Sequence, residues 1–449
     1  MQLKSVVLFL LVAFVLASVA VPASQFIPGP KPGDFAYPPS GYENEKPGVV
    51  LKHRIFEPHE LGIFEINATA HEMLYRSSGR TDSEPLAAIA NVLVPNNPDK
   101  GKVVIHVPPE DSASNKCSPS ETLKKGNFYV KEDQFARQDI LLVNTYLQQG
   151  WIVIIPDYEG PHSAFGVTAL SGHIVLDSAR ASRNLRELGL NDDVKFVMIG
   201  YSGGASSSAW AVQLHESYAP DINLVGSTFG GTPVNLIEHM VVNDKTKHTP
   251  TFMNTMGGII NGNPDKEHEI LQYFNRDGLE GLHWVRTHCP GQSSEKDNVN
   301  IRRPSTAFLK GGKNFTQVPL IMELLWQSTL PQKNLDAPRI PIFMFHAKSD
   351  TTIKLKPAKE AAEQWCKNGA NIHFQTQTFP VSHKAAYIAT YADTMAFIKD
   401  RFDGKEYYGG KCHFDSVATP AFNIRRDIQL AGQMIDTAKT LFGSLTHSN

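Results

Sequence analysis

Short apolar runs such as WIVII and IPIFMF alternate along the chain with longer segments whose apolar residues recur at helical spacing. Continuous apolar runs are typical of strands that are covered on both faces of a sheet. The runs predict strands at Ala87–Val94, Lys102–Val107, Trp151–Ile155, Val194–Ile199, Asn223–Ser227, Ile340–Phe345 and Ile372–Thr378. The intervening segments predict helices at Gln134–Gln149, Ser171–Gly189 and Ala205–Tyr218. This alternation indicates an α/β fold with a mainly parallel central sheet.

The alternation breaks between about Asn235 and Leu335, where amphipathic helical segments such as Glu269–Val285 and Pro319–Thr329 occur without a convincing strand. The alternating pattern then returns, so we interpret this stretch as a helical cap, or lid, inserted above the sheet. The predicted organisation follows from these segments: a signal at 1–20, a core at 21–234 that begins with a Pro- and Gly-rich arm, the cap at 235–335, and a second part of the core at 336–449 that ends in a C-terminal flap.

The first twenty residues have the pattern of a secretory signal. Lys4 precedes twelve apolar residues from Val6 to Ala17, and small residues follow at Ser18 and Ala20. An apolar core of this length is too short to span a bilayer, and the small residues fit a cleavage site. No later segment reaches about 18 uninterrupted apolar residues. We therefore expect a secreted protein without a transmembrane segment.

Composition and charge further narrow the class of protein to which the chain can belong. The chain is 41% hydrophobic and 20% charged and has no low-complexity tract, which is typical of a soluble globular protein. Its formal net charge of −2 gives no overall field that would attract nucleic acid or anionic lipid. We expect no nucleic-acid partner.

Export changes what the cysteines and two of the asparagines are expected to do. In an oxidising compartment the four cysteines are expected to form two disulfides; they are Cys117, Cys289, Cys366 and Cys412. Zinc binding is the alternative, but no C-x-x-C or H-x-x-x-H pair supports it, so no metal site is predicted. The sequons at Asn67 and Asn314 are predicted glycosylation sites.

The strongest chemical signal is Gly200-Tyr201-Ser202-Gly203-Gly204, which fits G-x-S-x-G. The motif follows the strand VKFVMI directly and opens a predicted helix, the setting that a nucleophile elbow requires. Glycines relieve crowding where the backbone turns sharply, and the N-terminus of the helix offers free N–H groups to a developing oxyanion. We therefore predict Ser202 as a nucleophile; the alternative is an ordinary tight strand-to-helix connection.

A serine needs a base, and in this setting the partners follow in the order serine, acid, histidine. Asp350 comes just after the strand RIPIFMFHA, and His383 comes just after the strand NIHFQTQTF. Parallel strands bring both groups to the sheet edge where Ser202 emerges, so His383 is predicted as the base and Asp350 as the residue that orients it. Asp336 precedes its strand and His346 comes before Asp350, so neither fits the pattern.

Several long segments of the chain resemble the secretory lipase family of fungi, the lipase A type of α/β-hydrolases. They are GYSGGASSSAWAVQLHESYAPDINLVGSTFGGTP (200–233), HVPPEDSASNKCSPS (106–120), GWIVIIPDYEGPHSAF (150–165), FHAKSD (345–350) and EQWCKNGANIHF (363–374), and the similarity runs from about residue 30 to 430. The resemblance implies an α/β-hydrolase fold and the same triad of Ser202, Asp350 and His383. The chain departs from the family at Thr351–Lys354, which leaves the substrate preference open.

The resemblance also implies features that spacing alone does not give. Asp111, in the segment after the strand KVVIHV, and Gly203 are expected to form the oxyanion hole, with Asp111 acting through a protonated carboxyl group or through its backbone N–H. The implied disulfides join Cys117 to Cys289 and Cys366 to Cys412.

Together these features predict a secreted lipase that hydrolyses acylglycerol esters through an acyl-enzyme, works at a lipid–water interface, needs no cofactor and is a monomer. A carboxylesterase for smaller esters or a serine peptidase would use the same triad. A non-catalytic, lipid-binding protein that keeps the fold is the alternative from another class. We further expect apolar faces of EILQYFNRDGLEGLHWV and VPLIMELLWQSTL in the cap to line an acyl pocket.

Overall fold

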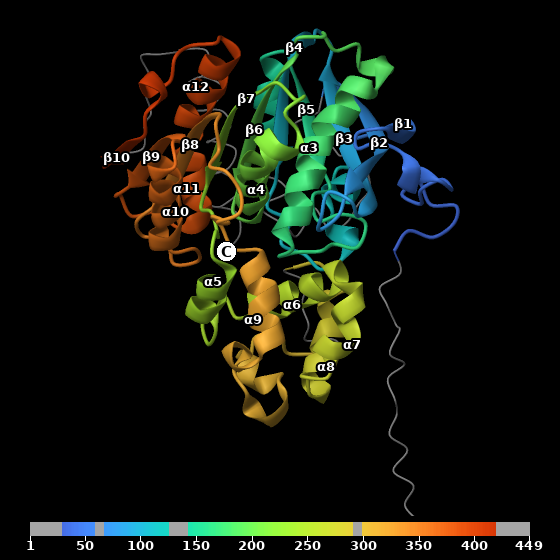
Figure 1. Ribbon diagram of the computed structural model, residues 1–449, viewed down its shortest axis with the longest axis vertical. Helices are drawn as coiled ribbons and strands as arrows, with labels where there is room; N and C mark the ends of the chain where they lie inside the picture. The colour runs from blue at the N-terminus through green and yellow to red at the C-terminus, as the bar shows by residue number, and fades with distance from the viewer. Residues whose placement is uncertain (1–28, 59–66, 125–141, 291–298, 419–449) are drawn as a thin grey trace, which may run out of the picture.

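The computed structural model of the protein describes residues 29–58, 67–124, 142–290 and 299–418, and these residues form a ten-stranded sheet with helices on both faces (Figure 1). The strand order is β1-β2-β3-β5-β4-β6-β7-β8-β9-β10. Pairing is antiparallel from β1 to β5 and parallel from β5 onward to β10. The structure therefore confirms the predicted α/β architecture with a mainly parallel sheet.

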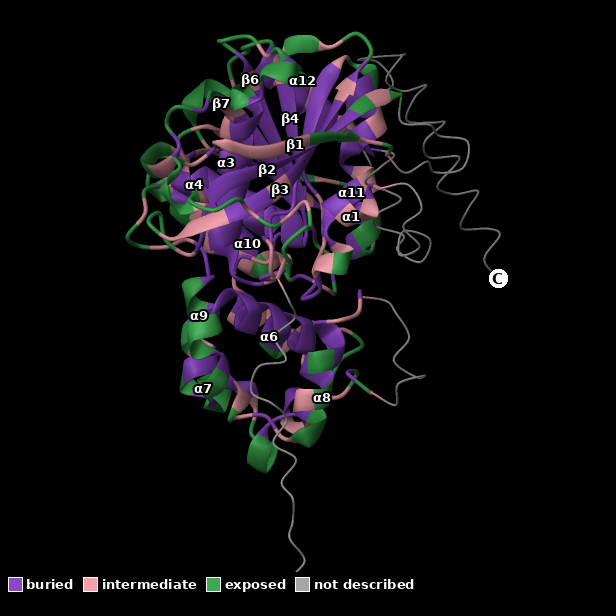
Figure 2. Ribbon diagram, turned by 90° about the vertical axis from the view of Figure 1, so that its right-hand side faces the viewer, coloured by how far each residue is buried: buried purple, intermediate pink, exposed green. Residues whose placement is uncertain are grey.

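All seven predicted strands are present. They are β3 (Pro85–Pro95), β4 (Asp99–Val107), β5 (Trp151–Pro156), β6 (Lys195–Tyr201), β7 (Leu224–Gly230), β8 (Pro341–Ala347) and β9 (Asn371–Gln377). The central strands are apolar on both sides because both sides are covered. In β6, for example, Phe196 and Met198 belong to one buried cluster while Val197 and Ile199 belong to the other. Figure 2 shows these strands buried at the centre of the molecule.

Each face of the sheet has its own helices. Helices α3 (Thr168–Asn184) and α4 (Gly203–Tyr218) pack on each other and on the face of Phe196, together with α10 (Leu355–Lys367). The opposite face is covered by the helical residues 142–148, by α11 (His383–Ala389) and by α12 (Tyr391–Phe402). This three-layer packing fixes the strand ends in space.

Three strands were not predicted. Strand β1 (Val50–Phe56) lies at an edge of the sheet and lacks a clean alternation of apolar and polar residues, so no strand was predicted within the Pro- and Gly-rich arm. Strand β2 (Ala68–Ser78) buries polar side chains such as Glu72 and Ser77. Strand β10 (His413–Val417) is short and partly exposed. The predicted signal at 1–20, residues 134–141 of the predicted helix at Gln134–Gln149 and residues 419–449 of the predicted second part of the core lie outside the described residues.

The segment between β7 and β8 forms a helical group beside the carboxyl ends of the parallel strands (Figure 1). Its helices are α5 (Leu236–Asn243), α6 (Pro250–Gly262), α7 (Glu267–Leu271), α8 (Arg276–Val285) and α9 (Pro319–Gln327). The single helix expected at Glu269–Val285 is two helices, since Asn275 caps the start of α8 by accepting a hydrogen bond from Gly278 N–H. The described residues of this segment contain no named strand.

Two disulfides join distant parts of the chain, with the pairing that the resemblance implies. Cys117 is bonded to Cys289, which links the segment after β4 to the segment that follows α8 in the helical group. Cys366 is bonded to Cys412, which links α10 to the start of β10. Among the residues described, no helix is both long and apolar enough to cross a bilayer.

Candidate active site

Ser202 lies on a sharp turn between β6 and α4. Its φ angle of 53° is in the left-handed region, which a serine adopts only when its surroundings hold it there. A side chain at Gly204 would collide with the carbonyl oxygens of Val107 and Pro108, so the glycine lets the start of α4 approach the end of β4 closely. The turn has the geometry of the predicted nucleophile elbow.

His383 joins Ser202 to Asp350. Its Nε2 lies 2.9 Å from Ser202 Oγ and its Nδ1 lies 2.6 Å from Asp350 Oδ2. The three residues follow β6, β8 and β9, whose carboxyl ends meet at one sheet edge. The structure therefore brings together all three residues that the sequence pattern selected, and all three are at least nine-tenths buried.

The Asp350 carboxylate is held as an anion. Its Oδ1 accepts hydrogen bonds from the backbone N–H groups of Thr352 and Ile353, at 2.8 Å and 2.9 Å. Burial alone would raise its pKa, but the hydrogen bond from His383, the charge of that ring and the backbone donor outweigh burial and lower the pKa below its usual value. An ionised Asp350 can stabilise a protonated His383.

Two residues that the sequence reasoning missed support this pair. Tyr201 Oη donates to the backbone oxygen of His383 at 2.5 Å, and its ring stacks on Tyr387 with a centroid distance of 4.4 Å. His346, which the order rule set aside, lies behind the carboxylate with Nε2 3.6 Å from Asp350 Oδ2. Tyr201 is the variable position of the G-x-S-x-G motif, and His346 lies four residues before Asp350, so neither the motif nor the order rule predicts these supporting contacts.

The residues expected to form the oxyanion hole also lie together. Asp111 has a φ of 53°, and a side chain at Gly203 would collide with Asp111 Oδ1. Gly203 is the first residue of α4, so its N–H is one of the helix donors without an intrahelical partner. The segment that carries Asp111 is positioned by Tyr158, whose Oη accepts a hydrogen bond from Glu110 N–H at 3.0 Å.

A group of buried acids surrounds the Asp111 segment. Burial, and then the neighbouring charge of Asp157, raises the pKa of Glu110 well above its usual range. Burial, and then the charge of Glu110, raises the pKa of Glu159 in the same way. Burial raises the pKa of Asp157 to about 7, although Ser120 donates two hydrogen bonds that oppose the shift. Protonated acids keep negative charge away from the place where an oxyanion would form.

Asp157 gives this arrangement a measurable effect on stability. Between its ordinary pKa of 3.8 and its folded value of about 7, the folded protein holds a proton that the unfolded chain releases. The contribution of Asp157 to the free energy of unfolding therefore falls as pH rises through this range. We expect Asp157→Asn, which does not titrate, to gain stability relative to the wild type with rising pH, by up to about 1.4 kcal/mol per pH unit.

Urea unfolding of both proteins between about pH 4.5 and about pH 7.5 measures this difference. Asp192→Asn, which changes an exposed aspartate, is the matched control and should show no such trend. A difference between Asp157→Asn and wild type that stays constant with pH would show that Asp157 titrates normally.

A cavity of about 280 Å³ opens in front of Ser202. From the core it is lined by Tyr158, Phe165 and Gly203, among others. From the helical group it is lined by Leu236 and His239 of α5, by Lys247 and His248, and by Pro250, Thr251, Asn254 and Thr255 of α6. The two cap segments in which we expected an acyl pocket do not line it. Their apolar residues, such as Leu324 and Trp284, are buried in the core cluster instead.

The two sequons differ in their surroundings. Asn67 is exposed and accepts a hydrogen bond from Asn96. Asn314 is half-buried, and its amide nitrogen, the atom that would carry a glycan, donates to Asp244 Oδ2 at 3.2 Å. Asn67 is therefore the better acceptor by geometry, and glycosylation of either residue stays a prediction.

Comparisons with known proteins agree on one group. A protein-family model described as secretory lipase matches residues 132–410. A secreted triacylglycerol lipase of Malassezia globosa is 36% identical over 87% of this chain and 83% of its own length. A secreted triacylglycerol lipase of Malassezia furfur is 32% identical over 93% of this chain and 90% of its own length.

Solved structures extend the comparison. Candida antarctica lipase A is 26% identical and superposes with a TM-score of 0.80, covering 92% of this chain and 95% of the other. A rice cell wall degrading esterase of Xanthomonas oryzae shares the fold alone, at 15% identity and a TM-score of 0.60 over 81% of this chain and 100% of the other.

Proposed function

The chain belongs to the secretory lipase family and is a secreted carboxylic ester hydrolase of the α/β-hydrolase fold, and from this premise we propose that it is a triacylglycerol lipase whose catalytic residues are Ser202, His383 and Asp350. The observation that carries the proposal is the continuous contact from Ser202 Oγ through the His383 ring to Asp350 Oδ2. The names of the Malassezia relatives support triacylglycerol as the substrate.

In the proposed reaction His383 Nε2 accepts the Ser202 proton while Ser202 Oγ attacks the ester carbonyl carbon. The tetrahedral intermediate collapses when His383 returns that proton to the alcohol oxygen, which leaves as a diacylglycerol. Water then attacks the acyl-enzyme and gives a proton to His383. The fatty acid is released as His383 returns this proton to Ser202. Asp350 stabilises the positive charge on the ring in both halves.

In this proposal, Gly203 N–H and Asp111 stabilise the negative charge that develops on the ester carbonyl oxygen. The start of α4 points its free N–H groups and the positive end of its dipole at the site. Asp111 contributes either through its backbone N–H or through a protonated carboxyl group, and the neutral acids Glu110 and Glu159 beside it add no repulsion.

We also propose that residues 235–335 act as a cap over the site. Helices α5 and α6 line the cavity in front of Ser202, so an acyl chain that enters the cavity is in contact with them. Each buried methylene contributes about 0.8 kcal/mol before ordering costs. Medium- and long-chain esters should therefore be bound better than acetates.

A series of p-nitrophenyl esters tests this assignment. We expect kcat/KM to rise from two-carbon to eight-carbon acyl groups, because the added methylenes leave water for the cavity. Activity on a triacylglycerol emulsion should accompany the rise. A steady fall in kcat/KM along the series, with no hydrolysis of the emulsion, would instead identify a carboxylesterase for small esters.

Contact of the protein with a lipid–water interface can be tested at two exposed apolar side chains. Trp326 of α9 is 58% exposed, and Ile55 of the edge strand β1 is 64% exposed. If the helical group meets the lipid surface, Trp326→Ser should lower the rate on an emulsion while leaving the rate on a soluble ester unchanged. Ile55→Ser is the matched control and should change neither rate. Equal effects of the two substitutions would contradict contact through the helical group.

A further inference from the structure

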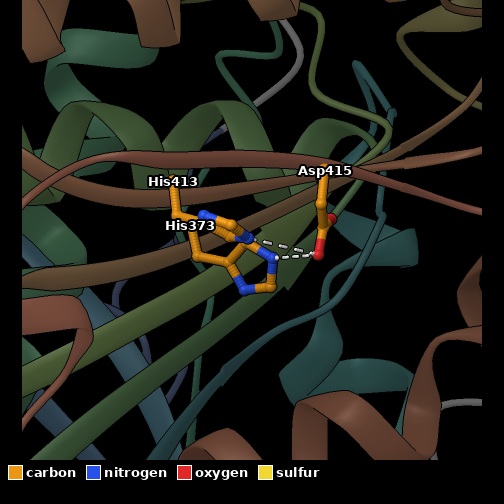
Figure 3. Close-up of side chains that lie close together, drawn as sticks. All are labelled: His373, His413 and Asp415. Atoms are coloured by element: carbon orange, nitrogen blue, oxygen red, sulfur yellow. Dashed lines mark ion pairs between the residues drawn. The ribbon is translucent and has the colours of Figure 1, made fainter.

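We propose that His373, His413 and Asp415 form a binding site for a divalent transition-metal ion such as Zn²⁺, separate from the catalytic residues (Figure 3). One ligand atom from each residue, two imidazole nitrogens and one carboxylate oxygen, lies within 4.8 Å of the others. Neither the reaction nor the cavity in front of Ser202 uses any of the three.

The backbone of two paired strands sets the arrangement. Strands β9 and β10 are parallel, and His373 of β9 is the register partner of His413 of β10. Asp415 is two residues beyond His413, so its side chain projects from the same face of β10. The opposite face has a different character, since Phe374 and Phe414 stack there with a centroid distance of 5.8 Å. The pleat therefore collects the three polar groups on one face.

The distances suit a small ion. His373 Nε2 lies 3.1 Å from Asp415 Oδ2, and His413 Nε2 lies 3.6 Å from the same oxygen. Tetrahedral zinc with bonds of about 2.0–2.1 Å separates its ligand atoms by about 3.3 Å. Figure 3 shows both rings turned toward the Asp415 carboxylate, so closing the site requires only side-chain rotation.

One polar atom of this cluster has no partner in the surrounding protein. His373 is 8% exposed and its Nε2 faces Asp415 Oδ2, whereas Asp415 Oδ1 is buried without a hydrogen-bond partner within the described part of the chain. Buried polar atoms in native proteins normally have partners, so this unsatisfied oxygen points to a ligand. Aromatic rings support the rest of the site, as His413 stacks on Tyr408 with a centroid distance of 4.6 Å.

The donor set selects the class of ion. Two imidazole nitrogens and one carboxylate suit Zn²⁺ and neighbouring transition metals, whereas Ca²⁺ and Mg²⁺ take oxygen ligands. Three protein ligands leave a fourth position for water, which can reach the site because His413 and Asp415 are partly exposed. An ion held by both strands binds only the folded protein and so stabilises the pairing of β10 with β9.

Zinc added to the full-length protein after chelator treatment tests the site. We expect isothermal titration calorimetry to detect one equivalent of Zn²⁺ and the melting temperature to rise with its concentration. His413→Ala and Asp415→Asn should each weaken this binding by at least about tenfold, since even second-shell changes cost about 10–100-fold. Both side chains are at least partly exposed, and a melting temperature without zinc close to that of the wild type verifies folding of each variant.

Two controls separate this site from others. His383→Ala should keep the zinc equivalent, which distinguishes the site from the catalytic histidine. His283→Ala, which changes an exposed histidine on α8, should also keep it. The proposal is overturned if the wild type shows no zinc-dependent rise in melting temperature. It is also overturned if a folded His413→Ala or Asp415→Asn variant binds zinc as the wild type does.

Discussion

Ser202→Ala is expected to reduce ester hydrolysis by on the order of 10⁶-fold, to the level left by binding and oxyanion stabilisation alone. The substitution removes the only atom of the site that can form the acyl-enzyme in the proposed reaction. Stability should change little, because a small side chain replaces another and the backbone N–H of Ser202 keeps its bond to Gly230 O. Steady-state kinetics on a soluble ester, together with urea unfolding, measures both effects.

His383→Ala should be as severe, because His383 is the one base hydrogen-bonded to Ser202 Oγ among the described residues. Residues that act as a unit are not additive, so the double variant should be no slower than either single one. Ser178→Ala is the matched control, since Ser178 is a buried serine of α3 whose hydroxyl bonds only to Val175 O among the contacts described. Substantial activity in Ser202→Ala or His383→Ala would remove that residue from the mechanism.

Asp350→Asn is expected to lower kcat by about 10³–10⁴-fold while leaving KM nearly unchanged. The surroundings of the side chain determine which way the new amide points. Backbone N–H groups of Thr352 and Ile353 both donate to Oδ1, so the amide oxygen of Asn occupies that position and its NH₂ group faces His383 Nδ1. The NH₂ group then donates to Nδ1 and places the ring proton on Nε2. A ring in that tautomer cannot accept the proton of Ser202.

The pH profile checks this explanation, because the variant loses the anion that stabilises a protonated His383. For Asp350→Asn, we expect the activity that returns at high pH to come mainly from direct attack of hydroxide on the ester, and less from His383 acting as the base. Asp336→Asn is the matched control, since Asp336 is exposed and precedes β8 instead of following it. A kcat for Asp350→Asn within tenfold of the wild type would show that Asp350 does not orient the histidine.

The catalytic candidates were predictable because each follows an apolar strand. Parallel strands end at one edge, so Ser202, Asp350 and His383 could be placed near one another from strand order alone. Their supporting contacts could not be placed in this way. Tyr201 reaches the backbone of His383 across 182 positions of sequence, and no local pattern encodes such a contact.

The rest of the fold was likewise predictable where a local pattern of residues indicates the element, and not predictable where contacts between distant segments decide it. Strand β2 buries the charged side chains of Glu72 and Arg76, so its sequence lacks the apolar pattern that indicates a buried strand. In the helical group, apolar spacing indicated helices correctly but not which of them face the cavity, because packing between helices decides that. The cluster on β9 and β10 escaped a search for metal motifs within single segments, since its ligands come from two strands.

The Cys117–Cys289 bond closes a covalent ring of the chain whose ends are 172 residues apart in sequence. Strands β5, β6 and β7, the proposed nucleophile Ser202 and helices α5 to α8 all lie within this ring. A protease that cuts the chain once inside the ring therefore produces two polypeptides that remain one molecule. Such a nicked protein migrates as a single band without reductant and separates into two fragments only after reduction.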